Sequence, residues 1–566
     1  MKKNLLTVIC FFIYSVGSFA QDFFNKKNYL NELIGKPLNI PYSFAGNFGE
    51  CRPNHFHSGL DFRTEGKENL PVYAVFDGFV SRIKIEKGGF GNAIYVTHPN
   101  GYTTVYAHLN RFFPALEKYT RTQQYKNNSW KIDFTLMPYQ FPVKKGQLIA
   151  YSGNTGNSSG PHLHLEIRDT KTENPLNPLL FFTVNDNQKP ILKELAIYNA
   201  EKSIYEQSPT ILQVNNNKFK KDTIETKANS VYFGVRADDL IQNMPGILGV
   251  FETRLYVNDK PIFAWQVDNI SYDSTRYVNA HADYKYKKIN NKWIQLCTKL
   301  KNDKLNIYKS FSPTNGKVDL SDGSYKRIRI ELYDVSYNKS FIEFYIKSNN
   351  TSASVTPCNN LMKAGVKNKF SNQNISFELN EDALYDDICF NYKTIPANNN
   401  YSDIYQIHYS YVPLHSKYNL TIKPKSEIPN QYKSKLAIVR TDNTVNSKTK
   451  NGSAAIVTPK GLEIETNAFG NFEIVIDQKP PVISTTLKNN MDVSKLNKIS
   501  FQVTEETTSL KSCNLYLGDQ WLRLVQNNNT FTYEFDEKLS KGKNEIKIIA
   551  IDENDNKAEK TFIINR

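Results

Sequence analysis

Residues Ser159–Asp169 read SGPHLHLEIRD and place two histidines one residue apart in an otherwise apolar run. Side chains alternate between the two faces of a β-strand, so His162, His164 and Glu166 are expected on one face. The opposite face, directed at a hydrophobic core, then carries Leu163, Leu165 and Ile167. Two imidazoles on one face can divide the labour of catalysis: one binds a metal and the other moves protons. Taken alone, the stretch is better explained by two exposed strand histidines.

The other histidines argue for a metal site. Six of the nine lie in one segment, namely His55, His57, His98, His108, His162 and His164. His57 and Asp61 form an H-x-x-x-D pair, and Ser58 and Gly59 between them indicate a loop that enters a strand. With His164 they supply two imidazoles and one carboxylate, which leaves a fourth position for water, as a catalytic zinc requires. A single carboxylate leaves such a site net positive, and this acidifies the bound water.

A third imidazole is expected beside this set. In TTVYAHL, Tyr106 and His108 are predicted to share one face of a strand. The segment YSGNTGNSSGPH precedes the His-Leu-His strand, and its glycines allow the tight turns that deliver that strand to the rim of the site. These glycines are Gly153, Gly156 and Gly160.

Four pieces of sequence resemble the lysostaphin-type, or LytM-type, zinc endopeptidases of peptidoglycan. They are HSGLDF, PVYAVFDGFV, GFGNAIYVTHPNGYTTVYAHL and VKKGQLIAYSGNTGNSSGPHLHLEIRD, in matching order over roughly residues 45 to 170. The resemblance implies a small antiparallel β-sheet domain with Zn²⁺ in a groove. It also implies His57, Asp61 and His164 as zinc ligands, and His108 and His162 as the catalytic pair.

Two features depart from that family. An insertion at about residues 112–141 follows His108 and is expected beside the groove, partly helical near Ala115–Tyr119. Cys51 precedes His57, and its thiolate is either a cap on the zinc or a buried cysteine without a metal. His55 does not fit the spacing to Asp61.

The rest of the chain is also predicted to be β. A length of 566 residues is too great for one core. Short alternating runs rich in Tyr and Phe, separated by Asn, Asp and Gly, are typical of strands. We expect a mainly β protein in which a peptidase domain precedes immunoglobulin-like β-sandwich domains. The expected segments are a signal peptide at 1–20, the peptidase domain at 21–185, an immunoglobulin-like domain at 186–350, a β domain of unknown role at 351–476 and a second immunoglobulin-like domain at 477–566.

A diverged repeat supports the two immunoglobulin-like domains. DNQKPILKELAI from Asp186 resembles DQKPPVISTTL from Asp477, and Asp334 and Asn338 recur as Asp552 and Asn556 before similar final strands. An Asp-x-x-x-Asn segment can indicate calcium, but turn formation explains it without a metal. The first copy carries a long insertion before its final hairpin.

The first twenty residues predict export. Lys2 and Lys3 precede an apolar run and small residues that end at Ala20, which is typical of a cleaved signal peptide; an uncleaved membrane anchor is the alternative. We expect no transmembrane span in the mature chain and a location in the periplasm or cell envelope, or outside the cell. Cys358 and Cys389 are the only close cysteine pair, and the sequence leaves their bonding open.

The leading hypothesis is an exported zinc metalloendopeptidase that cuts the stem-peptide cross-links of peptidoglycan, with the D-alanyl-diaminopimelate bond favoured. The alternative is a non-enzymatic envelope regulator or scaffold that binds a cell-wall amidase or the wall. All five site positions are intact, which favours an enzyme. The net charge of +15 reflects a composition rich in lysine, and without a basic patch that alternates with aromatics it does not indicate nucleic acid. The rear β domains are candidates for binding an envelope protein partner, and no ligand is expected from them, so residues 21 to 186 should fold and bind zinc alone.

Overall fold

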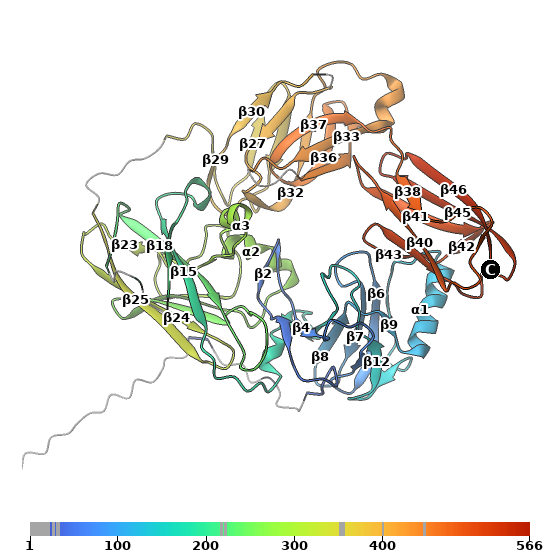
Figure 1. Ribbon diagram of the computed structural model, residues 1–566. Helices are drawn as coiled ribbons and strands as arrows, with labels where there is room; N and C mark the ends of the chain where they lie inside the picture. The colour runs from blue at the N-terminus through green and yellow to red at the C-terminus, as the bar shows by residue number, and fades with distance from the viewer. Residues whose placement is uncertain are drawn as a thin grey trace, which may run out of the picture.

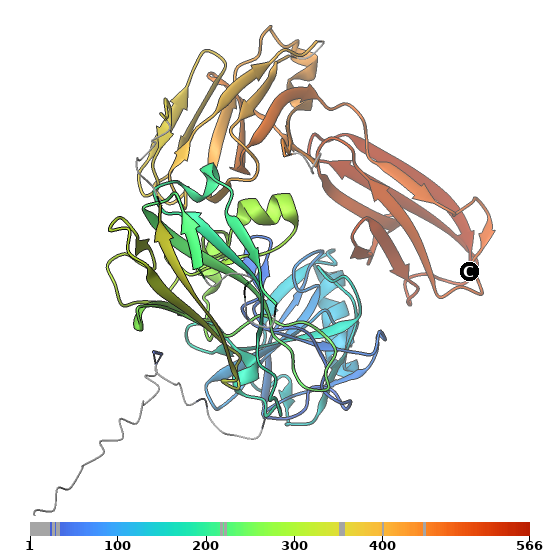
Figure 2. The same ribbon diagram turned by 60° about the vertical axis from the view of Figure 1, so that its left-hand side comes forward.

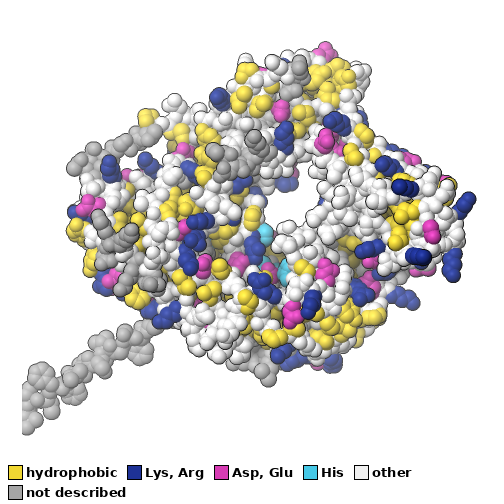
Figure 3. All heavy atoms as spheres, viewed as in Figure 1, with side chains coloured by type: hydrophobic (Ala, Val, Ile, Leu, Met, Phe, Trp, Pro, Cys, Tyr) yellow, Lys and Arg dark blue, Asp and Glu magenta, His cyan; other side chains and the backbone are white. Residues whose placement is uncertain are grey.

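The protein is mainly β, as predicted, and its four regions follow one another in a circle (Figures 1 and 2). The space-filling view shows that the circle encloses an opening (Figure 3). The computed structural model describes residues 23–24, 29, 34–215, 219, 223–349, 357–398, 401–444 and 449–566. The predicted signal peptide at 1–20 lies outside the described residues. Within the described chain, no helix has the length and apolar character needed to cross a membrane.

The N-terminal domain is an antiparallel sheet that carries most of the histidines. Its strand order is β1-β4-β13-β8-β7-β6-β10, with β11 on β6 and β14 on β13, and a small sheet β5-β12-β9 lies beside it. The elements are β1 (Phe44–Gly46), β2 (Cys51–Arg52), β3 (His55–Phe56), β4 (Leu60–Arg63), β5 (Pro71–Tyr73), β6 (Gly78–Ile85), β7 (Asn92–Thr97), β8 (Tyr102–Ala107), β9 (Arg111–Phe112), α1 (Pro114–Lys126), β10 (Ile132–Thr135), β11 (Pro142–Val143), β12 (Leu148–Tyr151), β13 (His162–Asp169), β14 (Pro175–Leu176) and η1 (Pro178–Leu180).

The alternation predicted for the His-Leu-His strand is confirmed. Leu163 and Leu165 on β13 are fully buried in the core of this domain. Pairing places His164 opposite Asp61 on β4 and opposite Ala107 on β8, and directly opposed residues point to the same face. The period of two along β13 therefore separates a core face from a face that carries His162, His164 and Glu166.

The second domain has two sheets, β16-β15-β18-β21 with β23 on β18, and β17-β25-β24-β19-β20-β22. The insertion expected in this copy holds α2 and α3. The elements are β15 (Ile191–Asn199), η2 (Ile204–Glu206), β16 (Thr210–Gln213), β17 (Thr223–Thr226), β18 (Ser230–Asp238), β19 (Glu252–Val257), β20 (Lys260–Gln266), η3 (Tyr272–Tyr277), α2 (Val278–His281), α3 (Tyr284–Asn290), β21 (Gln295–Leu296), β22 (Tyr308–Ser310), β23 (Val318–Asp319), β24 (Lys326–Tyr333) and β25 (Lys339–Ser348).

The third domain also has two five-stranded sheets, β27-β28-β32-β36-β35 and β30-β31-β37-β33-β34, and a short β26-β29 pair. The elements are β26 (Leu361–Met362), β27 (Asn368–Ser371), β28 (Ile375–Leu379), β29 (Ile388–Cys389), β30 (Tyr392–Ile395), β31 (Ile404–Ile407), β32 (Pro413–Ile422), η4 (Asn430–Lys435), β33 (Leu436–Thr441), β34 (Lys450–Ala454), β35 (Ile456–Thr458), β36 (Gly461–Ala468) and β37 (Gly470–Ile476).

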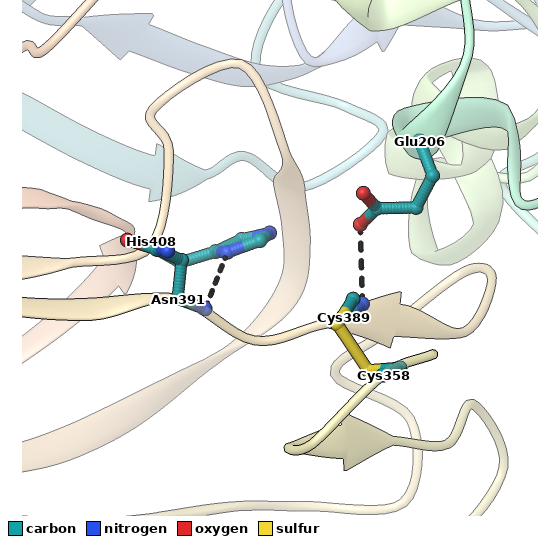
Figure 4. Close-up of a disulfide and its surroundings, with 5 residues drawn as sticks. All are labelled: Glu206, Cys358, Cys389, Asn391 and His408. Carbon is teal, nitrogen blue, oxygen red and sulfur yellow. Dashed lines mark hydrogen bonds between the residues drawn. A yellow bond between two sulfur atoms is a disulfide. The ribbon is translucent and has the colours of Figure 1, made fainter. Parts of the chain in front are cut away.

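A disulfide joins the only close cysteine pair. Cys358 is bonded to Cys389 at the end of β29 (Figure 4). The backbone N–H of Cys389 donates to the Glu206 carboxylate of the second domain over 3.1 Å, and a nearby Asn391 N–H donates to Nδ1 of His408. The disulfide therefore ties the start of the third domain close to its contact with the second.

The fourth domain pairs β38-β40-β44-β43 in one sheet and β39-β46-β45-β41-β42 in the other, around a core of its own. Its far end lies beside the insertion helix α1 (Figure 1). Tyr125 of α1 packs edge-on against Trp521 and donates to Asp536, and Arg121 of α1 pairs with Glu534. The elements are β38 (Val482–Thr485), β39 (Met491–Asp492), β40 (Lys498–Thr504), β41 (Leu510–Leu517), β42 (Gln520–Leu522), β43 (Val525–Asn527), β44 (Thr530–Glu534), β45 (Lys543–Asp552) and β46 (Lys557–Asn565).

The cores of the first two domains interlock. Ile241 and Leu248 of the second domain belong to the core of the N-terminal sheet. Conversely, Phe48 and Phe56 of the N-terminal domain belong to the core that the second and third domains share. Removing the second domain would expose these apolar side chains, so the expectation that residues 21 to 186 fold alone neglects a real energetic cost.

Candidate metal centre and catalytic residues

Three side chains converge on one face of the N-terminal sheet. Nε2 of His57 lies 3.0 Å from Oδ1 of Asp61 and 3.1 Å from Nδ1 of His164, and that Nδ1 lies 2.9 Å from the same Oδ1. All three residues are buried. The structure therefore brings together the residues that the sequence predicts as metal ligands.

The two histidines of this group direct their ring N–H groups away from its centre. Nδ1 of His57 donates to the carbonyl of Asn47 over 2.7 Å, because a carbonyl can only accept. Nε2 of His164 faces the Glu166 carboxylate at 3.1 Å, which likewise only accepts. In the neutral rings, the three converging atoms are thus lone pairs without a proton among them.

Electrostatics show that the centre of the group favours positive charge. Burial lowers the pKa of His164, but its hydrogen bonds with Asp61 and Glu166 outweigh this and raise it to about 9. Burial raises the pKa of Asp61, yet His57 and His164 hold it well below its ordinary value. A cation at the centre would satisfy all three lone pairs at once.

Zinc fits this donor set. Zinc binds imidazole nitrogen and carboxylate oxygen at about 2.0–2.2 Å, and tetrahedral ligands at that distance lie roughly 3.3 Å apart. The observed separations between the three atoms, 2.9 to 3.1 Å, are close to that value. The described chain therefore offers three candidate zinc ligands, already close to one another, of which only Asp61 bears a formal charge.

Two further imidazoles border the group. His108 and His162 lie with ring centroids 4.6 Å apart, and Nε2 of His162 is 3.6 Å from the Asp61 carboxylate. Nδ1 of His108 donates to the carbonyl of Thr155, and Nδ1 of His162 donates to that of Gly160, each over 2.8 Å. In the neutral rings these contacts leave Nε2 of both without a proton.

Both rings are held in the neutral form. Burial, with neighbouring His164 and His162, lowers the pKa of His108 to about 3. Burial also lowers the pKa of His162. Their Nε2 atoms accordingly carry no proton near neutral pH, which is the state in which a general base must start.

The expected pairing of Tyr106 with His108 is wrong. Strand β8 ends at Ala107, and His108 adopts a left-handed conformation with φ of 57°. Tyr106 lies in the core, where its hydroxyl accepts the N–H of Val75. The strand alternation stops one residue before the histidine, so the hydroxyl and the imidazole point to different sides of the sheet. A strained φ at a functional residue holds a side chain where the regular strand would not.

Glu166 orients the ligand His164, a role that the sequence did not reveal. Glu166 is fully buried, and its Oε1 accepts from Nε2 of His164, from the Ser58 hydroxyl and from the Tyr272 hydroxyl. Arg168 donates to Oε2 over 2.7 Å. Burial raises the pKa of Glu166, but Arg168, His164 and Ser58 together lower it to about 2. An ionised outer carboxylate fixes the tautomer and the ring orientation of a metal-binding histidine.

The second domain completes the surroundings of the metal group. Tyr272 belongs to η3 of that domain, and its ring is 38% exposed although its hydroxyl contacts Glu166 at 2.5 Å. Gly249 of the same domain exchanges two hydrogen bonds with the side chain of Asn47, whose carbonyl holds His57. The sequence carried no sign of either contact, because each joins residues more than a hundred positions apart in the chain.

Two glycines permit the close approach of loops to the site. A Cβ on Gly59 would lie 2.5 Å from the Leu165 carbonyl and 2.8 Å from the ring of His164. Gly156 has φ of +74°, and a Cβ there would meet the backbone of Gly91 at 2.3 Å. Larger residues would push apart the loops that carry His57 and the Thr155 carbonyl.

The remaining candidates lie outside the metal group. His55 is exposed, and its Nδ1 is 3.0 Å from the Pro53 carbonyl. His98 is buried between the Asp77 carbonyl and the Thr104 hydroxyl. Cys51 packs against the shared core of the second and third domains, and burial raises the pKa of its thiol. Its position and its protonated thiol agree with a buried cysteine rather than a cap on the metal.

The insertion lies mainly at the edge of the sheet farthest from β1. Its strand β10 pairs with β6, and Leu116 of α1 packs into the core with most of the insertion aromatics. A cleft between α1 and the fourth domain is lined by residues that include Glu117, Arg523 and Thr155, and the Thr155 carbonyl holds His108. The insertion thus lines a cleft that reaches the residue holding the candidate catalytic His108.

A buried group of two imidazoles and one carboxylate, flanked by two neutral imidazoles on one face of the sheet, is the arrangement that a metallohydrolase requires. Residues 55–127 and 120–178 match the model of peptidase family M23, so this part of the chain is similar to M23 peptidases. Residues 359–477 match the Zu5-like domain.

Curated relatives share this domain. The DD-carboxypeptidase/endopeptidase Mpg of Neisseria meningitidis is 35% identical over 123 residues, 22% of each chain. An uncharacterized metalloprotease of Haemophilus influenzae is 36% identical over 23% of this chain and 21% of its own. The peptidoglycan DD-endopeptidase ShyB of Vibrio cholerae is 33% identical over 20% of each. The match thus spans about a fifth of the length of these relatives.

Proposed function

We propose that the protein is a zinc endopeptidase that hydrolyses peptide cross-links of peptidoglycan at the D-alanyl-diaminopimelate bond. The observation that carries the proposal is the convergence of one ligand atom each from His57, Asp61 and His164 beside the imidazoles of His108 and His162. The relatives named DD-endopeptidase support this class of substrate.

In this proposal His57, Asp61 and His164 hold the zinc. Zinc, when bound, acidifies a water molecule and polarises the carbonyl of the scissile peptide. Nε2 of one flanking imidazole, His108 or His162, takes a proton from the attacking water and passes it to the leaving amine. The imidazolium that this transfer forms offsets the negative charge that develops on the substrate oxygen, until its proton passes to the leaving amine.

The remaining parts of the chain suit work on a large polymer. The predicted signal peptide would export the protein to the periplasm or cell envelope, where its substrate is found. The rear β domains are proposed to limit or direct access to the wall, and they offer surfaces for an envelope protein partner. The rival function is a non-enzymatic regulator, but such a protein has no need of a complete ligand set with two proton-transfer groups beside it.

Digestion of defined muropeptides, followed by mass spectrometry, tests the proposal. A dimer cross-linked through D-alanyl-diaminopimelate should yield two monomers of the masses expected for hydrolysis of that bond alone. A dimer linked directly between two diaminopimelate residues serves as the control and should remain intact. An intact D-alanyl-linked dimer after incubation with zinc-loaded protein would contradict the proposal and favour the regulator.

A further inference from the structure

Two groups of carboxylates lie outside the peptidase domain, one in the second domain and one in the fourth. The first group is Asp186, Asp239 and Asp334, and the second is Asp477, Glu505 and Asp552. In each group, one oxygen from each side chain lies within 4.8 Å of the other two. None of these six residues takes part in the proposed peptidase chemistry.

The two groups occupy equivalent places in the two repeated domains. Asp186 stands five positions before the first residue of β15, and Asp477 stands five before the first residue of β38. Ile191 pairs with Asp238, and Val482 pairs with Thr504, so Asp239 and Glu505 each follow the residue opposite the first strand. The third acid ends or follows the strand before the final hairpin in both domains, as Asp334 and Asp552.

Turn chemistry accounts for only part of each group. The backbone and side chain of Asn338 donate to the two carboxylate oxygens of Asp334 over 2.8 and 2.7 Å. Asn556 donates to Asp552 in the same way, over 2.8 Å in both bonds. These bonds explain the recurring Asp-x-x-x-Asn segments. They do not explain why two more acids gather at each of them.

Each group contains a buried oxygen without a hydrogen-bond partner among the described residues. These oxygens are Oδ1 of Asp239, which is 4% exposed, and Oδ1 of Asp477, which is 1% exposed. A buried carboxylate oxygen left unsatisfied is costly, and native proteins normally avoid it. The unsatisfied oxygens belong to different members of the two equivalent groups, but each group has one, and this points to a missing ligand of positive charge in both.

The electrostatic surroundings of the two acid groups also favour a bound cation. Burial, with Asp334 and Asp186, raises the pKa of Asp239 to about 8, and burial raises the pKa of Asp334 to about 6. Burial and Asp552 also raise the pKa of Asp477. No lysine or arginine in the described parts of the chain forms an ion pair with any of the six acids; the side chain of Lys435, near the second group, donates instead to the Asn554 carbonyl.

Calcium suits this combination best. Ca²⁺ takes six to eight oxygen ligands in flexible geometry, whereas Mg²⁺ demands a strict octahedron and usually retains several waters. Zinc sites generally include nitrogen or sulfur ligands, and these clusters offer only oxygen. We propose that Asp186, Asp239 and Asp334 bind one Ca²⁺ ion and that Asp477, Glu505 and Asp552 bind a second.

Both sites lie where one domain meets the next. The loop after Asp239 sends Ile241 and Leu248 into the core of the peptidase domain. Beside Asp552, the carbonyl of Asn554 accepts from Lys435 of the third domain over 2.7 Å. Asp186 and Asp477 stand where the chain enters each domain. Calcium would therefore fasten the entering segment to the turn and loop that touch the preceding domain, and would hold the domains around the opening in one arrangement.

Calcium titration of the full-length, zinc-loaded protein in metal-depleted buffer tests the proposal. Equilibrium dialysis with radioactive calcium should give two bound ions per chain. Asp239→Asn should lose one of the two, Glu505→Gln should lose the other, and the double variant should lose both. These substitutions keep the shape of the side chain and remove its charge. Matched controls are Asp259→Asn and Asp519→Asn, two exposed acids at equivalent positions in the same domains, and both should retain two ions.

A second readout does not depend on the variants. Millimolar calcium should raise the unfolding temperature of the wild-type protein, and the double variant should lose this shift while the controls keep it. Absence of calcium binding by the folded wild-type protein at millimolar concentration would overturn the proposal. Unchanged stoichiometry in Asp239→Asn and Glu505→Gln would do the same, and retention of magnesium against excess calcium would overturn the choice of ion.

Discussion

The metal group of the peptidase domain and the acid clusters of the β domains differ in charge and in donor type. The first combines two imidazoles with one carboxylate, and the others consist of carboxylates alone. Two neutral nitrogens leave a bound divalent ion with a net positive charge, which is what activation of water requires. Three carboxylates more than balance the charge of a divalent ion, so the β-domain clusters are suited to holding segments of chain together. The composition of each set separates a catalytic role from a structural one.

The outer contacts differ as well. Around the peptidase group, Glu166 and the Asn47 carbonyl fix the rings, and both are braced by the second domain. Around the clusters, each recurring asparagine fixes one acid, and another acid keeps an unsatisfied oxygen. The His57, Asp61 and His164 group is held in place by these contacts. The acid clusters instead need a cation to offset the cost of burying their carboxylates.

The largest expected effect is the loss of hydrolysis when one of the three proposed zinc ligands is removed. His57→Ala or Asp61→Ala should abolish cleavage of the cross-linked dimer, because each removes one of only three protein ligands. Cleavage is measured by mass spectrometry of the products. His55→Ala, two positions from His57 and exposed, is the matched control and should cleave normally. If either ligand variant cleaved the dimer at the wild-type rate, the active site would have to lie elsewhere in the protein.

The two histidines of β13 should separate metal binding from proton transfer. His162→Ala should keep its zinc and lose about a hundredfold or more in turnover, since it removes a proton-transfer or oxyanion group. His164→Ala should lose the zinc itself. Zinc analysis combined with steady-state kinetics distinguishes the two results. An exchange of phenotypes between the variants would show that the assignment is inverted.

The contribution of the second domain should appear as weaker zinc binding. Tyr272→Phe removes a hydrogen bond to Glu166 and should raise the zinc dissociation constant about tenfold, in line with the cost of altering such outer contacts. Competition with a chromophoric chelator measures this constant. Tyr345→Phe, an exposed tyrosine of the same domain, should leave it unchanged. Equal affinities for wild type and Tyr272→Phe would mean that the contact does not act on the metal group.

The same reasoning predicts a difference between two truncations. A fragment of residues 21–350 retains Ile241, Leu248 and Tyr272, whereas a fragment of residues 21–186 lacks all three. The shorter fragment should unfold at a lower temperature and bind zinc more weakly. Thermal unfolding in the presence and absence of zinc tests this. Indistinguishable unfolding temperatures would restore the view of an independent peptidase domain.

The smallest expected effect concerns access to the site. Tyr125→Ala removes the contacts of α1 with Trp521 and Asp536, which close the circle of domains. Opening that circle should increase digestion of whole sacculi several-fold and leave cleavage of a soluble dimer unchanged, because only the polymer is restricted by the opening. Release of dye-labelled fragments from sacculi measures the first activity. A parallel rise on both substrates would indicate a change at the catalytic residues instead.

Local sequence patterns predicted the site where the chain is regular. The alternation along His162–Asp169 placed two histidines on one face because β13 is a regular strand paired on both sides. The same reasoning failed for His108, since β8 ends at Ala107 and the next residue turns to a positive φ. Strand termination depends on packing between loops, and a single-strand pattern carries no information on it.

Contacts between distant segments were beyond the sequence. Tyr272 reaches Glu166 across 106 positions, and no spacing rule links them. The Asp-x-x-x-Asn segments were recognised as turns, but Asp239 and Glu505 come from other strands and complete the clusters only after folding. The internal repeat did predict that whatever one β domain forms at this place, the other forms as well.

Zinc content of the double variant His57→Ala, Asp61→Ala tests the central claim most directly. The wild-type protein, purified in zinc-containing buffer and dialysed, should hold one zinc ion per chain by elemental analysis. The double variant, folded as judged by circular dichroism, should hold none. Full zinc occupancy in the double variant would contradict the assigned ligands and, with them, the proposed catalytic site.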